Sequence, residues 1–432
     1  MTPAVPLMTV EAVAERLIDY RGKTPPKTEA GARLITAKVI KRGQILPEPA
    51  EYIAADFYDE WMRRGLPQDL DVLITTEAPL GEVALLRMRE PVALAQRVIL
   101  LRANQAAIDP VYLFYALQSD FTRAELHARA SGTTVSGIKQ SELRQVRVPV
   151  PPLPVQRRIA GILSAYDNLI ENCEQRIRVL DEMVRTLYRE WFVHFRFPGH
   201  EKTPLVESSL GRIPKRWQGE RAGGVIRETR RNVHKGALED GQTRYVGLEH
   251  IPRRSLALNA WDETCELGSN KLRFEPGEVL FGKIRPYFHK VSVAPFHGVC
   301  SADTFVISAV AEPLRAFAIC LVSSDEFVAH ASATANGAKM PRANWDVLMN
   351  FPVALPPPTL LGSFASLVEP WLACQQSLVF RTHNLRKTRD LLLPRLLSGP
   401  IPRVARLDDG VAAASAHGGL DVGWRPKGND GR

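Results

Sequence analysis

Several features that support catalysis or metal binding are missing from this chain of 432 residues. No lysine has an Asp or Glu two positions before it, the spacing common in metal-dependent nucleases, and neither HExxH nor GxSxG occurs. The cysteines include no CxxC pair, so a zinc site has little support; they are Cys173, Cys265, Cys300, Cys320 and Cys374. We therefore expect no metal site and no catalytic activity in this chain alone.

Membrane and export signals are also absent. No apolar stretch approaches the ~18 residues that span a bilayer. The N-terminus has no basic region followed by an apolar run, so it does not resemble a signal peptide. The odd, scattered set of cysteines suits a reducing cytosol. The sequence therefore predicts a cytoplasmic protein with no membrane partner.

Two short motifs resemble nucleotide or cofactor sites without completing them. Residues 277–283 match the GxxxxGK spacing, but Ile284 stands where a Ser or Thr should bind magnesium, and Pro286 blocks the helix that should follow. Residues 109–112 approach the Asp-Pro-Pro-Tyr motif of adenine methyltransferases but lack its second proline. We interpret Asp109 as a helix N-cap followed by proline at the first helical position.

What the chain does have is an excess of positive charge. Lys and Arg number 56 against 47 Asp and Glu, a formal net charge of +9. An anionic partner such as nucleic acid is compatible with this charge. Many basic proteins bind nothing anionic, so charge alone does not decide the matter.

The most informative feature is an internal repeat. Residues 132–187 align with residues 337–392 at a constant offset of 205, and VRVPVPP at 146–152 lies over FPVALPP at 351–357. A repeat of this length is too long for a solenoid unit. It indicates two similar domains, each followed by a similar helix, in a chain that contacts its target at two places.

Each copy of the repeat continues into a long apolar seam with alternating spacings of four and three residues, typical of a coiled coil. The second seam includes the polar residues Gln375, Thr382 and Arg389. The apolar seam positions are Ile159, Leu163, Tyr166, Ile170, Cys173, Ile177, Leu180, Val184, Leu187 and Trp191 in the first copy, and Phe364, Val368, Trp371, Leu378, Leu385, Leu392 and Leu396 in the second.

A seam of this length needs a partner. Two copies of the chain can pair, or the two helices of one chain can pair antiparallel; the repeat favours the second arrangement. The predicted fold class is α+β, with two similar α/β domains separated by two long antiparallel coiled-coil helices in a pseudo-two-fold repeat. The predicted boundaries are 1–152 and 199–355 for the domains, 153–198 and 356–398 for the helices, and 399–432 for a disordered tail.

Within the domains, shorter patterns predict individual elements. Helices are expected over 10–17 and 110–128, and strands over 72–75, 98–101, 244–248, 278–282 and 304–307. Proline-rich connectors at 149–154 and 356–358 lie before the two long helices.

Basic and small polar residues cluster in both domains, where they could contact DNA phosphates and base edges. An ordinary solvated face is the alternative for any one of them. The candidates are Lys23, Lys38, Lys41, Arg42, Arg63, Arg64, Thr75, Thr76, Thr133, Thr134 and Lys139 in the first domain, and Arg230, Arg231, Lys235, Arg244, Arg253, Arg254, Lys283, Arg285, Lys339 and Arg342 in the second.

Five segments resemble the specificity subunits of type I restriction–modification systems. They are IDYRGKTP at 18–25, DVLITTEAPLG at 71–81, VPPLPVQRRIAGIL at 150–163, GRIPKRW at 211–217 and GEVLFGKIRP at 277–286. The resemblance covers about residues 10 to 398, in the family's order of parts. The second copy departs from the pattern, since Thr359-Leu360-Leu361 replaces the expected Glu-Gln.

The resemblance implies two target-recognition domains that each read one half of a split double-stranded DNA sequence. The long helices would set the spacing and would dock two modification subunits. Those subunits would bind S-adenosylmethionine and methylate adenine. Two restriction subunits, where the system has them, would use ATP and Mg²⁺. A specificity protein of another restriction class, or a coiled-coil scaffold that binds protein and no DNA, are the alternatives.

Overall fold

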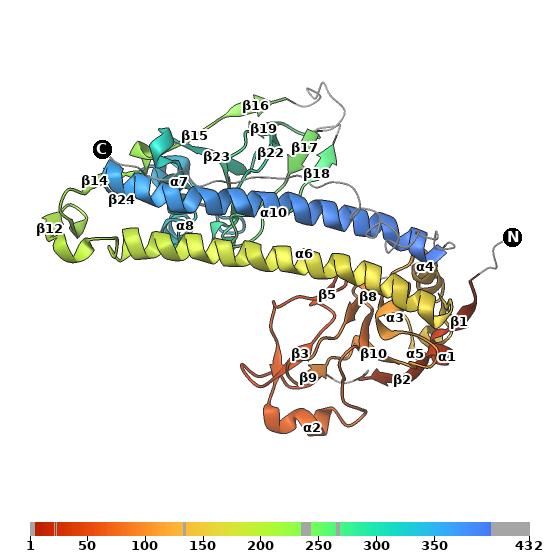
Figure 1. Cartoon of the computed structure of the whole chain (residues 1–432). Coiled ribbons are helices and arrows are strands. Elements are labelled where there is room, and N and C mark those ends of the chain that lie inside the picture. Colours follow the sequence, from red (N-terminus) through yellow and green to blue (C-terminus); the bar gives the residue numbers. More distant parts are fainter. Residues whose placement is uncertain are drawn as a thin grey trace, which may run out of the picture. The chain divides into compact units, whose positions relative to one another are not determined.

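The computed structural model describes residues 5–20, 22, 24–132, 135–234, 243–264 and 268–398 (Figure 1). The described chain divides into two compact units, one of residues up to Gly161 with the end of the last helix from Leu391, the other Ile162–Asp390. Several predictions lie outside the described residues: those for Lys23, Thr133, Thr134, Lys235 and the tail 399–432.

The first domain is built on a four-stranded antiparallel sheet with the order β2-β10-β7-β8. These strands are β2 (Ala14–Asp19), β7 (Val72–Thr76), β8 (Leu80–Leu85) and β10 (Val98–Ala103). Helix α3 (Pro110–Ala116) contacts β7, β8 and β10. Ile18, Leu73 and Leu100 are buried from this sheet in the domain core.

Smaller elements complete the first domain. A three-stranded sheet has the order β6-β3-β9, a hairpin joins β4 to β5, and β1 pairs with β11. The bounds are β1 (Leu7–Thr9), α1 (Val10–Val13), β3 (Ala32–Ile35), β4 (Ile40–Lys41), β5 (Gln44–Ile45), β6 (Tyr52–Ile53), η1 (Ala55–Phe57), α2 (Tyr58–Trp61), β9 (Val92–Leu94), α4 (Asp120–Ala128), α5 (Gln140–Arg144) and β11 (Arg147–Pro149).

The second domain repeats the four-stranded sheet with the order β15-β23-β20-β21, again antiparallel throughout. Its strands are β15 (Ile226–Glu228), β20 (Val279–Gly282), β21 (Val291–Val293) and β23 (Thr304–Ala309). Pairing of β14 (Gln218–Arg221) with β24 (Pro352–Leu355) corresponds to pairing of β1 with β11. Helices α7 (Arg315–Val322), α8 (Asp325–Ala333) and α9 (Trp345–Leu348) follow the sheet as α3, α4 and α5 do.

The two domains differ in what is added to this common frame. The second domain has a five-stranded sheet of order β16-β19-β22-β17-β18, in which β17 and β22 are parallel. The remaining bounds are β12 (Leu205–Ser208), β13 (Gly211–Pro214), η4 (Ala222–Gly224), β16 (Arg231–Val233), β17 (Thr243–Val246), β18 (Asp262–Thr264), β19 (Lys271–Phe274), η5 (Pro286–Phe288), β22 (Gly298–Ser301) and η6 (Glu312–Leu314).

Matching local chemistry confirms the repeat. Ser119 caps α4 and Ser324 caps α8, each hydroxyl accepting from the N–H three residues on at 3.2 Å. Asp71 before β7 accepts two hydrogen bonds from Arg102, and Glu278 before β20 accepts two from Arg231. Each acid also accepts a backbone N–H from the residue three positions earlier, at 2.7 Å.

Two sequence-based element predictions were wrong in part. The helix expected over 10–17 ends at Val13, because Ala14–Asp19 pairs with β10 as an edge strand of the main sheet. Tertiary pairing overrides a helical spacing in such a short segment. The helix expected over 110–128 is two helices, because Ser119 leaves the helical backbone to cap α4.

The two long helices are α6 (Leu153–Tyr188) and α10 (Pro358–Ser398), and α6 continues into a π-helical turn, η2 (Arg189–Val193). A 3-10 turn, η3 (His200–Lys202), follows η2. In the second unit α6 and α10 pack side by side and antiparallel (Figure 1). Arg389 donates to Asp167 at 2.6 Å, Arg386 pairs with Glu174, and Gln375 donates to Asp181 at 3.0 Å. The partner numbers fall along α10 as they rise along α6, which confirms the antiparallel arrangement.

Seam positions of both helices line this interface. Leu163, Ile170, Cys173, Ile177 and Val184 are buried on α6, as are Phe364, Val368 and Leu378 on α10. Polar Gln375 and Thr382 are buried with them. Tyr166, Leu180, Leu187, Trp371, Leu385 and Leu392 are half-buried, while Ile159 is buried in the first unit and Trp191 in the second. Beside Trp371, it is Leu372 that is buried.

A buried polar contact joins both helices to the second domain. The Asp181 carboxylate accepts from the Gln375 side chain at 3.0 Å and from the Leu256 backbone N–H at 3.0 Å and 3.2 Å. Asp181 is 6% exposed and Gln375 is 3% exposed. A buried carboxylate is tolerated only when its hydrogen bonds are satisfied, so this contact specifies one register for the helices.

We predict that Asp181→Ala destabilises the protein by about 2–3 kcal/mol, because it leaves the Leu256 N–H buried without its acceptor and the Gln375 amide with only the Ile177 O at 3.5 Å. The measurement is the midpoint of thermal unfolding. Glu182→Ala is the matched control, since the neighbouring Glu182 side chain is 71% exposed. Equal midpoints for the two variants would show that the buried contact contributes nothing to stability.

Candidate nucleic-acid interface

In each domain, a small polar loop contacts the end of one central strand of the main sheet. This strand is β7 in the first domain and β20 in the second. In the first domain Ser131 and Gly137 close the polar loop with two backbone hydrogen bonds of 2.8 Å and 2.9 Å, and Ile138 N–H donates to Thr76 O at 3.0 Å. In the second domain Asn336 and Arg342 close the equivalent loop with bonds of 3.0 Å and 2.9 Å. The closing residues are related by the repeat offset of 205.

The second domain holds its loops in a strained conformation. Arg254, Arg285 and His289 have positive φ angles of 52°, 50° and 51°. The Arg254 N–H donates to His289 O at 2.9 Å, and the Arg285 N–H donates to Pro341 O at 2.8 Å. Non-glycine residues in the left-handed region cost free energy and concentrate at functional sites. This surface is therefore the strongest candidate for a binding site in the second domain.

Several basic candidates of the first domain have side chains that are exposed. Lys41, Arg42, Arg63 and Lys139 are exposed and their side chains have no hydrogen bond or ion pair with other described residues. The Arg42 backbone N–H, in contrast, donates to Glu82 at 2.7 Å. These four cations are available for phosphate contacts.

Other candidates of the first domain are engaged within the fold. Lys38 lies 3.7 Å from Glu51, and the Arg64 guanidinium donates to Asp19 O. Thr75 is fully buried; its hydroxyl donates to Pro79 O at 2.6 Å and accepts from Glu82 N–H at 2.9 Å. Thr76 is 3% exposed. The two threonines therefore support the β7–β8 turn in this conformation.

The three arginines of the stretch from Arg230 to Arg244 are also engaged. Arg230 pairs with Glu228 at 2.6 Å, and Arg231 pairs with Glu278. Arg244 lies over the rings of Phe296, Trp261 and Phe380, with its guanidinium carbon 4.7 Å, 5.8 Å and 5.9 Å from their centroids. Since Phe380 belongs to α10, this cation–π contact fastens β17 to the helix.

Lys283 is held in a partly buried position. Its ammonium donates to Ala302 O at 3.0 Å, lies 3.8 Å from Glu228 and 4.5 Å from the centre of the Phe305 ring. Burial lowers the pKa of Lys283, and the nearby Glu228 carboxylate opposes that effect. The residue supports the loop more than it offers charge to a ligand.

The remaining candidates surround the strained loops. Lys339 is exposed and its side chain has no hydrogen bond or ion pair with another described residue. Arg253 is exposed and its guanidinium lies 4.1 Å above the Phe288 ring. Arg342 pairs with Asp303 at 3.1 Å but stays 57% exposed. Arg285 donates to Lys339 O at 3.5 Å.

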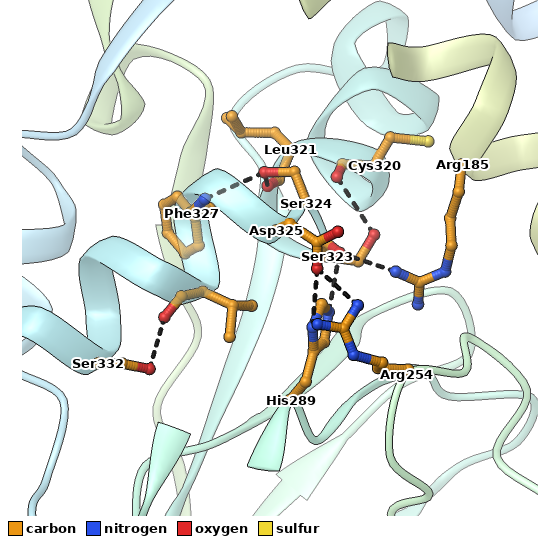
Figure 2. A network of polar contacts seen from close by, with 11 residues as sticks. Arg185, Arg254, His289, Cys320, Leu321, Ser323, Ser324, Asp325, Phe327 and Ser332 are labelled. Atoms are coloured by element: carbon orange, nitrogen blue, oxygen red, sulfur yellow. Dashed lines mark hydrogen bonds and ion pairs between the residues drawn. The ribbon is translucent and has the colours of Figure 1, made fainter. Parts of the chain in front are cut away.

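A polar network links these loops to α6 (Figure 2). Asp325 accepts from Arg254 at 2.8 Å and lies 3.5 Å from His289 Nδ1. His289 Nε2 and the Arg185 guanidinium both approach Ser323 O, at 3.0 Å and 3.1 Å. Because a carbonyl only accepts, His289 carries its proton on Nε2. The network fixes the exposed Arg254 relative to the helix that bears Arg185.

The first turn of α6 has its own anchor in the first unit. Gln156 is fully buried, accepts from the Asp109 N–H at 2.8 Å and donates to Pro151 O at 2.7 Å and Ala107 O at 3.1 Å. The residue at the repeat offset is Leu361, which is buried in an apolar core. The departure of the second copy from the repeat therefore replaces a polar anchor with an apolar one.

Sequence reasoning did not identify Asp325, His289 or Arg185, which position the basic residues of the second domain. It also overlooked the exposed apolar residues of these loops, among them Tyr287 and Met340, which are 56% and 55% exposed. The repeat offset could have drawn attention to Met340, because it aligns with the apolar Val135.

No described helix is long and apolar enough to cross a membrane. Among the residues that the structure describes, no three His, Cys, Asp or Glu side chains gather as metal ligands would.

Comparison with known proteins gives consistent matches. Residues 21–182 match the type I restriction modification DNA specificity domain. The chain is 24% identical over 339 residues to the type I restriction enzyme MjaIX specificity subunit of Methanocaldococcus jannaschii, covering 76% of this chain and 77% of that protein. It is 24% identical over 340 residues to the EcoDI specificity subunit of Escherichia coli, covering 74% and 72%.

A solved structure has a similar fold. The type I restriction-modification S subunit from M. genitalium superposes with a TM-score of 0.57 at 14% sequence identity, covering 93% of this chain and 98% of that one. At this identity the similarity concerns the fold, and it confirms two β-rich domains linked by long, packed helices.

His289 predicts a pH dependence of stability. Burial lowers the pKa of His289 below its usual 6.5, and the Arg185 charge adds to the effect. The unfolded chain therefore takes up the proton more readily, so this contribution is complete above pH 6.5 and declines as the pH falls below it. We expect the melting temperature of the wild type to drop between pH 7.5 and about 5 more than that of His289→Gln.

The matched control is His194→Gln, since His194 is exposed on the chain after α6. Burial lowers the pKa of His383 as well, but that residue is common to all three proteins. Parallel pH profiles for wild type and His289→Gln would refute the assignment to His289.

Proposed function

Because this chain is the DNA specificity subunit of a type I restriction–modification system, we propose that each of its two domains binds one half of a split double-stranded DNA target. The observation that carries the proposal is the duplicated frame: the same four-stranded sheet order, helix caps and closed polar loop occur in both domains. Two domains built on the same frame suit a DNA target with two half-sites, each bound in a similar way. The subunit is non-catalytic, as its family is.

We assign to the DNA backbone the exposed cations that have no ion pair among the described residues, together with the arginines of the strained loops. Lys41, Arg42, Arg63 and Lys139 serve the first half-site, and Lys339 with Arg253, Arg254, Arg285 and Arg342 serves the second. Arginine and lysine contact phosphates independently of sequence, and arginine also reads guanine in the major groove. Arg231, whose guanidinium donates two hydrogen bonds to Glu278, supports the fold instead.

The helix pair acts as the spacer between the half-sites. A helix of 36 residues such as α6 is about 54 Å long at about 1.5 Å per residue, which exceeds the ~34 Å between successive turns of DNA. The buried contact of Asp181 with Gln375 resists sliding of one helix along the other.

Partner subunits supply the chemistry in this proposal. Two modification subunits dock on the helices, bind S-adenosylmethionine and methylate an adenine that is extruded from the duplex in each half-site. Two restriction subunits, in a system that includes them, bring ATP- and Mg²⁺-dependent cleavage. The complex is cytoplasmic, where the host DNA lies. If the chain instead belonged to another restriction class, or bound only protein, the complex would produce no bipartite adenine methylation.

Lengthening both helices by one heptad tests the spacer. We propose duplicating residues 168–174 in α6 together with the opposing residues 382–388 in α10, so that the Glu174–Arg386 ion pair occurs twice. Seven residues preserve the seam and add about 10 Å at about 1.5 Å per residue. Methylation profiling of the assembled complex should show both half-sites unchanged and a spacer about 3 base pairs longer, at ~3.4 Å per base pair.

The control variant Glu174→Gln/Arg386→Gln keeps the helix length and should keep the spacer. An unchanged spacer in the duplication variant, with both half-sites still methylated, would refute the spacer role. If the wild-type complex itself produced no bipartite methylation, the proposed function would be refuted.

A second test concerns the phosphate contacts. Lys139→Gln and Lys339→Gln should each weaken DNA binding by the assembled complex and lower the slope of log affinity against log salt by about 0.9. Lys202→Gln, which changes an exposed lysine in η3 after α6, should leave the slope unchanged. Equal slopes for all three variants would remove the two loop lysines from the interface.

A further inference from the structure

Two exposed apolar side chains occupy equivalent places in the two domains. Val135 is 51% exposed and Met340 is 55% exposed. Among the large apolar residues exposed in the described part of the chain, only these two are related by the repeat offset of 205. A scattered exposed apolar residue needs no explanation. The same exposed position in both copies of a duplicated domain does.

The backbone holds each side chain in the same way. Val135 lies in the loop closed by Ser131 and Gly137, and Met340 lies in the loop closed by Asn336 and Arg342. A glycine with positive φ lies three residues before each of them, Gly132 at 117° and Gly337 at 106°. A Cβ on Gly132 would lie 2.3 Å from Val135 O, and one on Gly337 would lie 3.3 Å from Met340 O. The chain therefore folds tightly over the glycine and leaves the apolar side chain in solvent.

Cations lie near both side chains, and the acids beside the two loops, Glu77 and Asp303, are paired with Arg97 and Arg342. Exposed Lys339 precedes Met340 directly, Arg342 follows two residues later, and Arg285 donates to the Lys339 carbonyl. Exposed Lys139 follows Val135 at the start of α5. An apolar tip flanked by cations suits a ligand that carries negative charge and also offers an apolar surface. It suits double-stranded DNA, whose phosphates attract the cations while its stacked bases accept an apolar group.

We propose that Val135 and Met340 are apolar wedges, one for each half-site, that enter between bases and stabilise the extrusion of the adenine to be methylated. The inference rests on the proposed function and adds to it a named residue in each domain. Apolar side chains that enter a base step unstack it partly, and a methyltransferase must take its target base out of the stack. A wedge that fills the vacated space lowers the free energy of the extruded state.

The experiment uses the complete complex and a duplex that carries the target sequence found by methylation profiling, with 2-aminopurine replacing one target adenine. Extrusion raises 2-aminopurine fluorescence because the base leaves the stack. Val135→Ser should reduce the signal about tenfold at the first domain's half-site only, and Met340→Ser should do so at the other half-site only. Val135→Ile and Met340→Leu, which keep an apolar group of similar size, should retain the wild-type signal.

Leu66→Ser and Leu205→Ser are the matched controls, since these residues are 53% and 42% exposed in the first and second domain. Melting temperatures of all variants separate a folding defect from a wedge defect. The wedge proposal is overturned if the serine variants keep full extrusion, or if they lose affinity for DNA while the extruded fraction of bound duplex stays unchanged. A wild-type complex that neither binds nor methylates a bipartite target would instead overturn the proposed function.

Discussion

The rest of the molecule depends on the antiparallel pairing of α6 with α10 in the second unit. Three polar contacts join these two helices, and each needs one residue from α6 and a different residue from α10. They are Asp167 with Arg389, Glu174 with Arg386, and Asp181 with Gln375. Pairing of α6 with a second copy of α6 would remove all three partners and leave the Asp181 carboxylate buried without Gln375. Unpaired buried charge is costly, so the seam selects a partner as well as providing apolar burial. The antiparallel direction follows from the same contacts, because each successive acid of α6 meets an earlier residue of α10.

The second domain packs against the end of this helix pair where the seam becomes aromatic. Tyr188, Trp191 and Phe192 of the first long helix and its π-turn share one core with Phe364 of α10 and Phe317 of α7. Two polar contacts from other parts of the domain reach the same helix, at Asp181 and at Arg185. Such fastening matters for a protein that reads DNA without performing chemistry on it. Its contribution is to hold the DNA-binding loops in fixed positions. If the second domain could rotate on the helix pair, the protein would select the spacing between half-sites less strictly.

The sequence was sufficient to predict the elements defined by long periodic patterns. A seam that continues for many turns, and a repeat at a constant offset, are non-local regularities that no single substitution hides, and the predicted fold class was confirmed. The conformation of short segments was predicted less well. The segment 10–17 has a helical spacing, but its second half is an edge strand, because pairing with β10 decides its conformation. The threonines of the DVLITTEAPLG segment looked suited to base contacts, yet the Thr75 hydroxyl bonds to both Pro79 and Glu82 across a turn that only the folded backbone creates.

Charge is the property for which sequence and structure diverge most, and the divergence has a physical cause. A count of Lys and Arg cannot separate a cation that neutralises an acid from one that faces solvent. Arg102 and Arg231 each pair with the acid that precedes a central strand, β7 or β20. Arg244 lies on aromatic rings, and Arg386 and Arg389 of α10 pair with acids of α6. Among the described residues, the basic residues without an ion pair include Lys139 and Lys339 beside the polar loops, but also exposed arginines of α6 such as Arg176 and Arg178. The net charge of +9 is thus a poor measure of DNA binding. We assign recognition to the cations that the fold leaves exposed beside the polar loops of the two domains, such as Lys139 and Lys339.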